Sequence, residues 1–102
     1  MIFVDVDEVL QFVFQIQCSD ATVTVALLEI TDNALITTIT GGSAVALNLQ
    51  LSDPQYDTAE KLISAIKLST GYDVATTKDS DTSHKSSDLE VIPPTDIKQR
   101  FV

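Results

Sequence analysis

The first sixty residues of this 102-residue chain contain no lysine and no arginine. They carry nine carboxylates, whereas residues 61–102 hold six cations and six carboxylates, so the net charge of -9 lies entirely on the first sixty residues. Lysine commonly protects an open sheet edge against pairing with another chain. A sheet built from this segment therefore needs its edges covered in some other way.

Other residue types are scarce, and each scarcity excludes a class of protein. Three glycines and three prolines are too few for a low-complexity or disordered chain. The single cysteine, Cys18, excludes an internal disulfide and fits a reducing compartment. No apolar run approaches the roughly 18 residues of a membrane-spanning helix, and the scattered cations form no patch for nucleic acid or an anionic membrane. We expect one domain over residues 1–102. We expect neither nucleic acid nor a membrane as its partner.

The abundant β-branched residues predict strands. Valine, isoleucine and threonine account for 31 residues, and these types favour strands. Within residues 10–18, side chains alternate with period two, which is typical of a strand with one buried face. The predicted buried face holds Leu10, Phe12, Phe14, Ile16 and Cys18. The opposite face, which is uncharged, holds Gln11, Val13, Gln15 and Gln17.

Turn residues separate several further predicted strands, which cover residues 22–31, 35–40, 44–51, 72–77 and 89–92. In the first of these the apolar side chains change face, so either a bulge shifts the register or both faces are covered. Gly41-Gly42 predicts a hairpin turn, because glycine reaches positive φ without steric cost. Pro93-Pro94 is expected to end the last strand, because proline cannot donate to a ladder.

A helix is predicted after residue 56. Asp57 or Thr58 is the expected N-cap and Gly71 the expected C-cap. Its apolar stripe, at helical spacing, consists of Ala59, Leu62, Ile63 and Ile66. A helix of about 12 residues is too short to be stable alone, so it must lie on the sheet.

These elements predict an α+β fold. We expect an antiparallel β-sheet of four to six strands with one α-helix packed on one face. Residues 78–88 contain no apolar side chain and are predicted to be a mobile loop. Residues 93–102 are predicted to be a C-terminal tail.

The N-terminal segment Ile2–Val9 suggests chemistry at first sight. Its apolar strand followed by Asp5-Val6-Asp7 resembles the first signature of the haloacid-dehalogenase phosphatases. That resemblance implies a nucleophile at Asp5, a general acid/base at Asp7, and Mg²⁺ holding the phosphate. The family's fold needs a crossover helix between its first two parallel strands. Because residues 10–18 alternate as a strand, we reject the phosphatase.

Other candidate chemical groups lack suitable neighbours. Asp79–Ser83 begins like a calcium loop but lacks the later glycine and glutamate of an EF-hand. His84, the single histidine, is expected to be a solvated loop residue. Cys18 is expected to be a buried, inert thiol. We predict no catalytic, cofactor-binding or metal-binding residue, and a protein that is not an enzyme.

Residues 46–66 and 71–75 combine four cues. They hold a hydrophobic strand, an Asp-Thr-Ala helix start, a Leu-Ile-x-Ala-Ile stripe and a strand that opens with Gly-Tyr. This arrangement resembles strand–helix–strand modules of tailed-bacteriophage virion proteins, and a similar pattern occurs in inserted domains of flagellin and hook-associated proteins. The chain lacks the long helical termini of flagellins, which favours the phage resemblance. It implies a structural subunit of a phage particle, made in the host cytoplasm and located in the virion at the capsid surface, neck or tail.

Two functions from different classes follow. The first is non-enzymatic assembly through protein–protein contacts, with other virion proteins or copies of the chain as partners in a homo-oligomer. Its predicted interface residues are Gln11, Val13, Gln15, Gln17, Phe101 and Val102. The alternative is a small acidic inhibitor that mimics nucleic acid and binds a basic protein.

Overall fold

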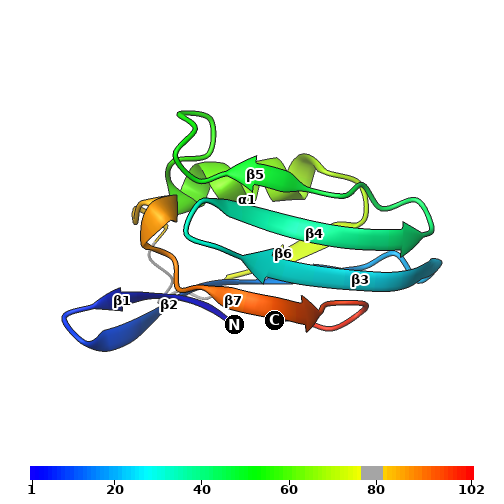
Figure 1. Cartoon of the computed structure of the whole chain (residues 1–102), viewed down its shortest axis with the longest axis horizontal. Coiled ribbons are helices and arrows are strands. Elements are labelled where there is room, and N and C mark those ends of the chain that lie inside the picture. Colours follow the sequence, from blue (N-terminus) through cyan, green and yellow to red (C-terminus); the bar gives the residue numbers. More distant parts are fainter. Residues whose placement is uncertain (77–81) are drawn as a thin grey trace.

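The computed structural model describes residues 1–76 and 82–102, which form two antiparallel sheets and one α-helix. One sheet has the strand order β1-β2-β6 and the other β5-β4-β3-β7. The elements are β1 (Ile2–Val6), β2 (Val9–Cys18), β3 (Val23–Ile30), β4 (Ala34–Gly41), β5 (Asn48–Gln50), α1 (Ala59–Leu68), β6 (Tyr72–Ala75), a 3-10 helix η1 (Ser86–Asp88) and β7 (Ile92–Asp96). Figure 1 shows the four-stranded sheet in front of β6 and α1. The predicted antiparallel α+β class is confirmed, with the strands divided between two sheets.

β1 and β2 form an N-terminal hairpin. Val6 pairs with Val9, and the linking residues Asp7 and Glu8 have φ angles of 52° and 68°. Two linking residues with positive φ are the pattern of a type I′ turn. The strand predicted over residues 10–18 is confirmed, and this hairpin lacks the parallel crossover that a haloacid-dehalogenase fold would need.

β3 contains the bulge that the sequence suggested. The register of its pairing with β4 shifts between Val23 and Val25. Val23 is buried before the shift, and burial resumes at Ala26, Leu28 and Ile30 after it. The extra residue therefore returns the apolar side chains to the core face.

Helix α1 begins and packs as predicted, although its end differs. The N-cap Thr58 accepts a hydrogen bond from the Lys61 amide, and the predicted apolar stripe is buried. The C-cap is Ser69, because the chain becomes extended there before Gly71. Gly71, with φ of 96°, instead forms the turn into β6.

Part of the predicted mobile loop is bonded to the start of α1. The Ala59 and Glu60 amides donate to the carbonyl oxygens of His84 and Thr82, at 2.9 and 3.0 Å. Ser86 is fully buried, and its hydroxyl donates to the Tyr56 carbonyl. These bonds satisfy amides that a helix start leaves open. Positions 78–81 of the predicted loop lie outside the described residues.

The segment predicted as a tail instead begins with strand β7. It pairs with β3, with Ile92 opposite Ile30 and Thr95 opposite Leu28. The expectation that Pro93-Pro94 ends a strand is wrong. Both prolines lie in an edge strand, where the register shifts between Leu28 and Ile30, and proline is tolerated at edges and bulges.

Beyond β7, the chain is bonded to both sheets. The Ile97 amide donates to Ala26 of β3 at 2.9 Å, and the Ile97 carbonyl accepts from Cys18 of β2 at 2.8 Å. Val102 and Ile16 of β2 then exchange two backbone hydrogen bonds, at 3.0 and 2.9 Å. We call Leu89–Val102 the C-terminal strap, because it joins the three-stranded sheet to the four-stranded sheet.

A buried hydroxyl pair forms a second connection between the sheets. The Tyr72 hydroxyl of β6 lies 2.7 Å from the Thr37 hydroxyl of β4, and it donates to the Val45 carbonyl at 2.6 Å. Because tyrosine has one hydroxyl proton, Thr37 must donate to Tyr72. Burial raises the pKa of the Tyr72 hydroxyl, and the bond from Thr37 opposes this rise.

The Asp20 carboxylate ties two loops together. One oxygen accepts from the amide and hydroxyl of Thr22, and the other accepts from the amides of Ser43 and Ala44 at 2.7 and 2.9 Å. These hydrogen bonds, the one from the Thr22 hydroxyl first, lower the pKa of Asp20 to about 2. A Cβ on Gly42 would lie 2.9 Å from the carboxylate, so the loop needs glycine there.

This attachment changes the strand predicted over residues 44–51. Residues 44–47 leave the ladder, and the ordered strand is reduced to β5. Alternation over residues 44–51 predicts Val45, Leu47, Leu49 and Leu51 on the inner face, but Val45 is exposed, and its amide donates to the Thr70 carbonyl. The other inward residues of the prediction, Leu47, Leu49 and Leu51, are buried.

Replacing Asp20 should destabilise the fold in a pH-dependent way. Its pKa is about 2 in the fold against an ordinary 3.8, so the stabilisation is present above about pH 4 and is lost as the pH falls towards 2. Asp20→Asn should lower the free energy of unfolding at pH 7, and the gap to the unsubstituted chain should narrow below pH 4. Urea unfolding from pH 2.5 to 7 measures both, with exposed Asp32→Asn as the control. A gap that does not change with pH would contradict the carboxylate's role.

Truncating Ile97 should also destabilise the fold strongly. Its side chain is 0% exposed, and Ile→Ala in a core typically costs about 2–5 kcal/mol. The control is Val91→Ala in the same strap, because an exposed valine should change the free energy of unfolding by no more than about 0.5 kcal/mol. Equal urea midpoints for the two variants would show that the strap is not part of the core.

Candidate functional site

The described residues hold no cluster that suggests catalysis. Asp5 and Asp7 are exposed on the hairpin, and no group of three His, Cys, Asp or Glu side chains within residues 1–76 and 82–102 could hold a metal ion. Asp79–Asp81 of the calcium-like motif lie outside the described residues. Cys18 is fully buried, as predicted.

His84 differs from its prediction. Its Nε2 lies 3.0 Å from Oε1 of Gln11 on β2, and the side chain is partly buried. The expectation of a solvated loop residue is therefore wrong. Backbone hydrogen bonds to the start of α1 hold the residues around His84 in place. The His84 side chain then meets Gln11 of β2, a long-range contact that the sequence around His84 does not reveal.

Most of the predicted interface contacts the chain itself. Val13 is 0% exposed and belongs to the core, so it is not a surface residue. Gln11 bonds to His84, and Gln17 donates to Asp73 at 3.3 Å. Two predicted residues at the C-terminus remain: Val102 is bonded to β2, whereas Phe101 is 40% exposed. Gln15 is partly exposed.

The largest departure from the sequence pattern lies at the hairpin. Val9 is 66% and Leu10 58% exposed, and Val6 also reaches solvent. We call Asp5–Leu10 the hairpin tip. Figure 1 shows it extending beyond the rest of the chain, at lower left. β6 pairs only with Gln15–Cys18, so the N-terminal half of β2 has β1 as its ladder partner and the third strand stops short of Leu10.

The turn at the hairpin tip departs from what stability favours. A type I′ turn prefers Asn-Gly or Asp-Gly, so Asp7 suits its position, but Glu8 takes the place of the preferred glycine at positive φ. A left-handed conformation costs an ordinary residue about 1–2 kcal/mol. Positions that break a local rule without an evident structural gain are candidates for function. The hairpin tip is therefore the first candidate site.

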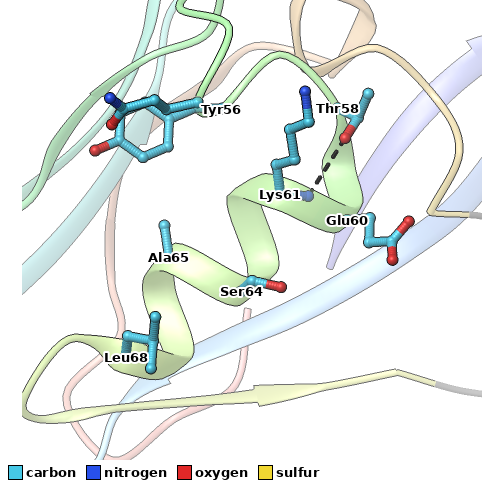
Figure 2. Close-up of a pocket in the computed structure, with 8 residues that line it drawn as sticks. Tyr56, Thr58, Glu60, Lys61, Ser64, Ala65 and Leu68 are labelled. Atoms are coloured by element: carbon cyan, nitrogen blue, oxygen red, sulfur yellow. Dashed lines mark hydrogen bonds between the residues drawn. The ribbon is translucent and has the colours of Figure 1, made fainter.

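A second candidate is an open groove beside α1, which we call the α1 groove. It has a volume of about 720 Å³ and is lined by Gln55, Tyr56, Thr58, Glu60, Lys61, Ser64, Ala65 and Leu68. Figure 2 shows Tyr56 on the loop before the helix, with Ala65 and Leu68 on the neighbouring side of α1 and Glu60 and Ser64 turned away. Leu68 is 89% exposed, the largest exposure of any large apolar side chain in the described residues.

Glu60 and Lys61 are the charged residues that line the α1 groove. The Nζ of Lys61 lies 2.9 Å from both the Pro54 carbonyl and the Asp57 carboxylate. This cation is therefore fixed within the loop–helix junction. An open groove with apolar walls, one paired lysine and a carboxylate turned away from those walls offers a place for side chains of a partner.

No helix in the described part of the chain is long and apolar enough to cross a membrane. The chain matches no protein-family model, no curated protein and no solved structure.

Proposed function

We propose that this chain is a non-enzymatic assembly subunit that acts through protein–protein contacts at its hairpin tip. The observation that carries the proposal is the exposure of Val9 and Leu10 on a projecting hairpin. Burying such a side chain contributes about 1.5–3 kcal/mol. A partner that covered both would therefore gain enough to hold the contact when it is repeated.

We further propose that the assembly is a phage particle, at its capsid surface, neck or tail. The support is the resemblance of residues 46–66 and 71–75 to strand–helix–strand modules of virion proteins. The partners would be other virion proteins or copies of this chain. A particle presents many copies side by side, so individually weak contacts suffice.

The hairpin tip supports assembly better than the strand edges do. β7 carries Pro93 and Pro94, which lack backbone donors, and β5 has only three residues. The outer edge of β1 is bridged by Leu89, and the Glu90 amide donates to Phe3. Prolines, short strands and covering segments all blunt sheet edges. The chain therefore manages these edges without lysine.

The inhibitor alternative receives less support. Several carboxylates accept hydrogen bonds from their own turns or from a neighbouring lysine, namely Asp20, Asp53, Asp57 and Asp96. Such carboxylates stabilise the fold and need no basic partner. The exposed carboxylates at the hairpin tip lie beside apolar side chains. This combination suits a protein partner whose surface is partly polar and partly apolar. Steeply salt-dependent binding to a basic protein would favour the inhibitor instead.

Polar substitution at the hairpin tip should weaken assembly. Val9→Ser with Leu10→Ser removes exposed apolar surface, so stability should stay unchanged while self-association weakens at least about tenfold. Sedimentation equilibrium at high protein concentration measures the association. Val25→Ser with Val91→Ser, two exposed valines elsewhere, is the matched control and should associate normally.

The phage assignment has its own test. Mass spectrometry of purified virions from the source should detect the chain, and the Val9→Ser, Leu10→Ser variant should be depleted from them. A chain that is monomeric at every concentration and absent from virions would contradict the proposal.

A further inference from the structure

We propose that two copies of this chain pair through the open edge of β2, at Leu10 and Phe12. This inference rests on the proposed assembly function and names the partner and the surface. The two β2 strands would run antiparallel about a two-fold axis that passes through Gln11. The two hairpins would then form one continuous sheet, and each copy would use the same surface.

The register of the hairpin shows which main-chain groups face this edge. Val6 pairs with Val9 across the two-residue turn, and the pair that closes such a turn is hydrogen-bonded. Hydrogen-bonded and unbonded pairs then alternate along an antiparallel ladder. Leu10 and Phe12, one and three positions beyond Val9, therefore belong to unbonded pairs with β1. Their amides and carbonyls point away from β1, towards the opposite edge of β2.

This edge has no partner among residues 1–76 and 82–102. β6 lies on the same side of β2 but pairs only with Gln15–Cys18, and no described backbone group bonds to Leu10 or Phe12 there. The contact with His84 is made by the side chain of Gln11 and leaves the main chain of the edge unbonded. The first sixty residues also contain no lysine to guard it. An open edge without such protection is a template for pairing with another chain.

The side chains along the open edge are apolar and match a second copy of themselves. Leu10 and Phe12 lie on one face of β2, and the Phe12 ring meets that of Phe3 edge to face, with centroids 6.2 Å apart. Leu10 is 58% exposed, and both phenylalanines are partly exposed. Leu10 of each copy would lie opposite Phe12 of the other and exchange both main-chain hydrogen bonds with it. Cross-strand contacts of this kind stabilise a sheet.

Charge is compatible with this contact and opposes a contact between two tips. The hairpin tip carries Asp5, Asp7 and Glu8 and no cation, so two tips packed together would bring like charges together. Antiparallel strands instead point the two turns in opposite directions. At about 3.4 Å per residue the turns would lie roughly 20 Å apart, beyond the screening length of about 8 Å. The residue on the two-fold axis, Gln11, is uncharged.

Cysteine cross-linking tests the register. Gln11 would face its own copy in an unbonded pair, where Cα atoms lie about 4.5 Å apart, and a disulfide spans about 4.4–6.8 Å. Under mild oxidation Gln11→Cys should form a covalent dimer at least about tenfold faster than Asp5→Cys, because both β2 strands would separate the two thiols of the latter. The native Cys18 is buried. Non-reducing electrophoresis measures the rates, and thermal unfolding under reducing conditions confirms that both variants are folded.

Charge substitution tests the two-fold axis. Gln11→Glu and Gln11→Lys each place two like charges on the axis, so each alone should associate at least about tenfold more weakly than the unsubstituted chain. An equimolar mixture should recover association, because opposite charges then meet. Gln15→Glu and Gln15→Lys are the matched controls, since β6 already occupies the edge at Gln15, and they should associate normally. Sedimentation equilibrium measures each sample.

The contrary outcomes separate this contact from the assembly function. Equal cross-linking of Gln11→Cys and Asp5→Cys in a chain that self-associates would overturn the edge pairing and leave the assembly function standing. A Gln11→Glu and Gln11→Lys mixture that stays dissociated would do the same. A monomeric unsubstituted chain that is present in virions would overturn the edge pairing alone. A monomeric chain absent from virions would overturn both proposals.

Discussion

The fold depends on one residue that is bonded to two sheets. Ile97 donates its amide to β3, accepts from β2 through its carbonyl, and buries its side chain completely. A buried backbone group must find a partner, and the C-terminal strap supplies partners to both sheets at once. The hydroxyl pair of Tyr72 and Thr37 is a second, smaller connection between the same layers.

Closure of the sheets explains why the hairpin tip is left exposed. The strap and β6 both pair with the C-terminal half of β2. The strap is bonded to Ile16 and Cys18, and β6 pairs with Gln15–Cys18. The N-terminal half of this ten-residue strand pairs with β1 alone. The chain measures 40 × 24 × 22 Å along its principal axes, and the hairpin projects beyond its body (Figure 1). The exposure of the hairpin tip is thus a consequence of where pairing stops.

Local sequence patterns predicted those helices and strands that are determined by neighbouring residues in the chain. Period-two alternation identified β2, and helical spacing identified the buried stripe of α1. The change of face in β3 left a bulge and coverage of both faces as alternatives, and the structure shows the bulge. Side-chain exposure at the tip was not predictable in this way, because alternation assigns Leu10 to a face without saying whether anything covers that face. The strap was missed for a related reason. Proline argues against a strand from the sequence alone, and only the topology shows that β7 is an edge strand.

The candidate site shows the same division. The carboxylates of the tip and the cations beyond residue 60 are visible in the sequence, and so is their separation. Where these charges lie in space required the fold, because Lys85 comes next to the start of α1 through its bridge to Thr58. Gln11 of the predicted glutamine face is bonded to His84 of the chain's own loop, a long-range contact that no local pattern predicts.

Native-state hydrogen exchange tests the closure by the strap most directly. The amides of Cys18, Gln99 and Val102 are bonded across the closure, and those of β3 and β4 report global unfolding. The strap amides should exchange as slowly as those of β3 and β4, because opening the strap would separate the sheets. Rapid exchange at Gln99 and Val102 alongside full protection in β3 would contradict this account.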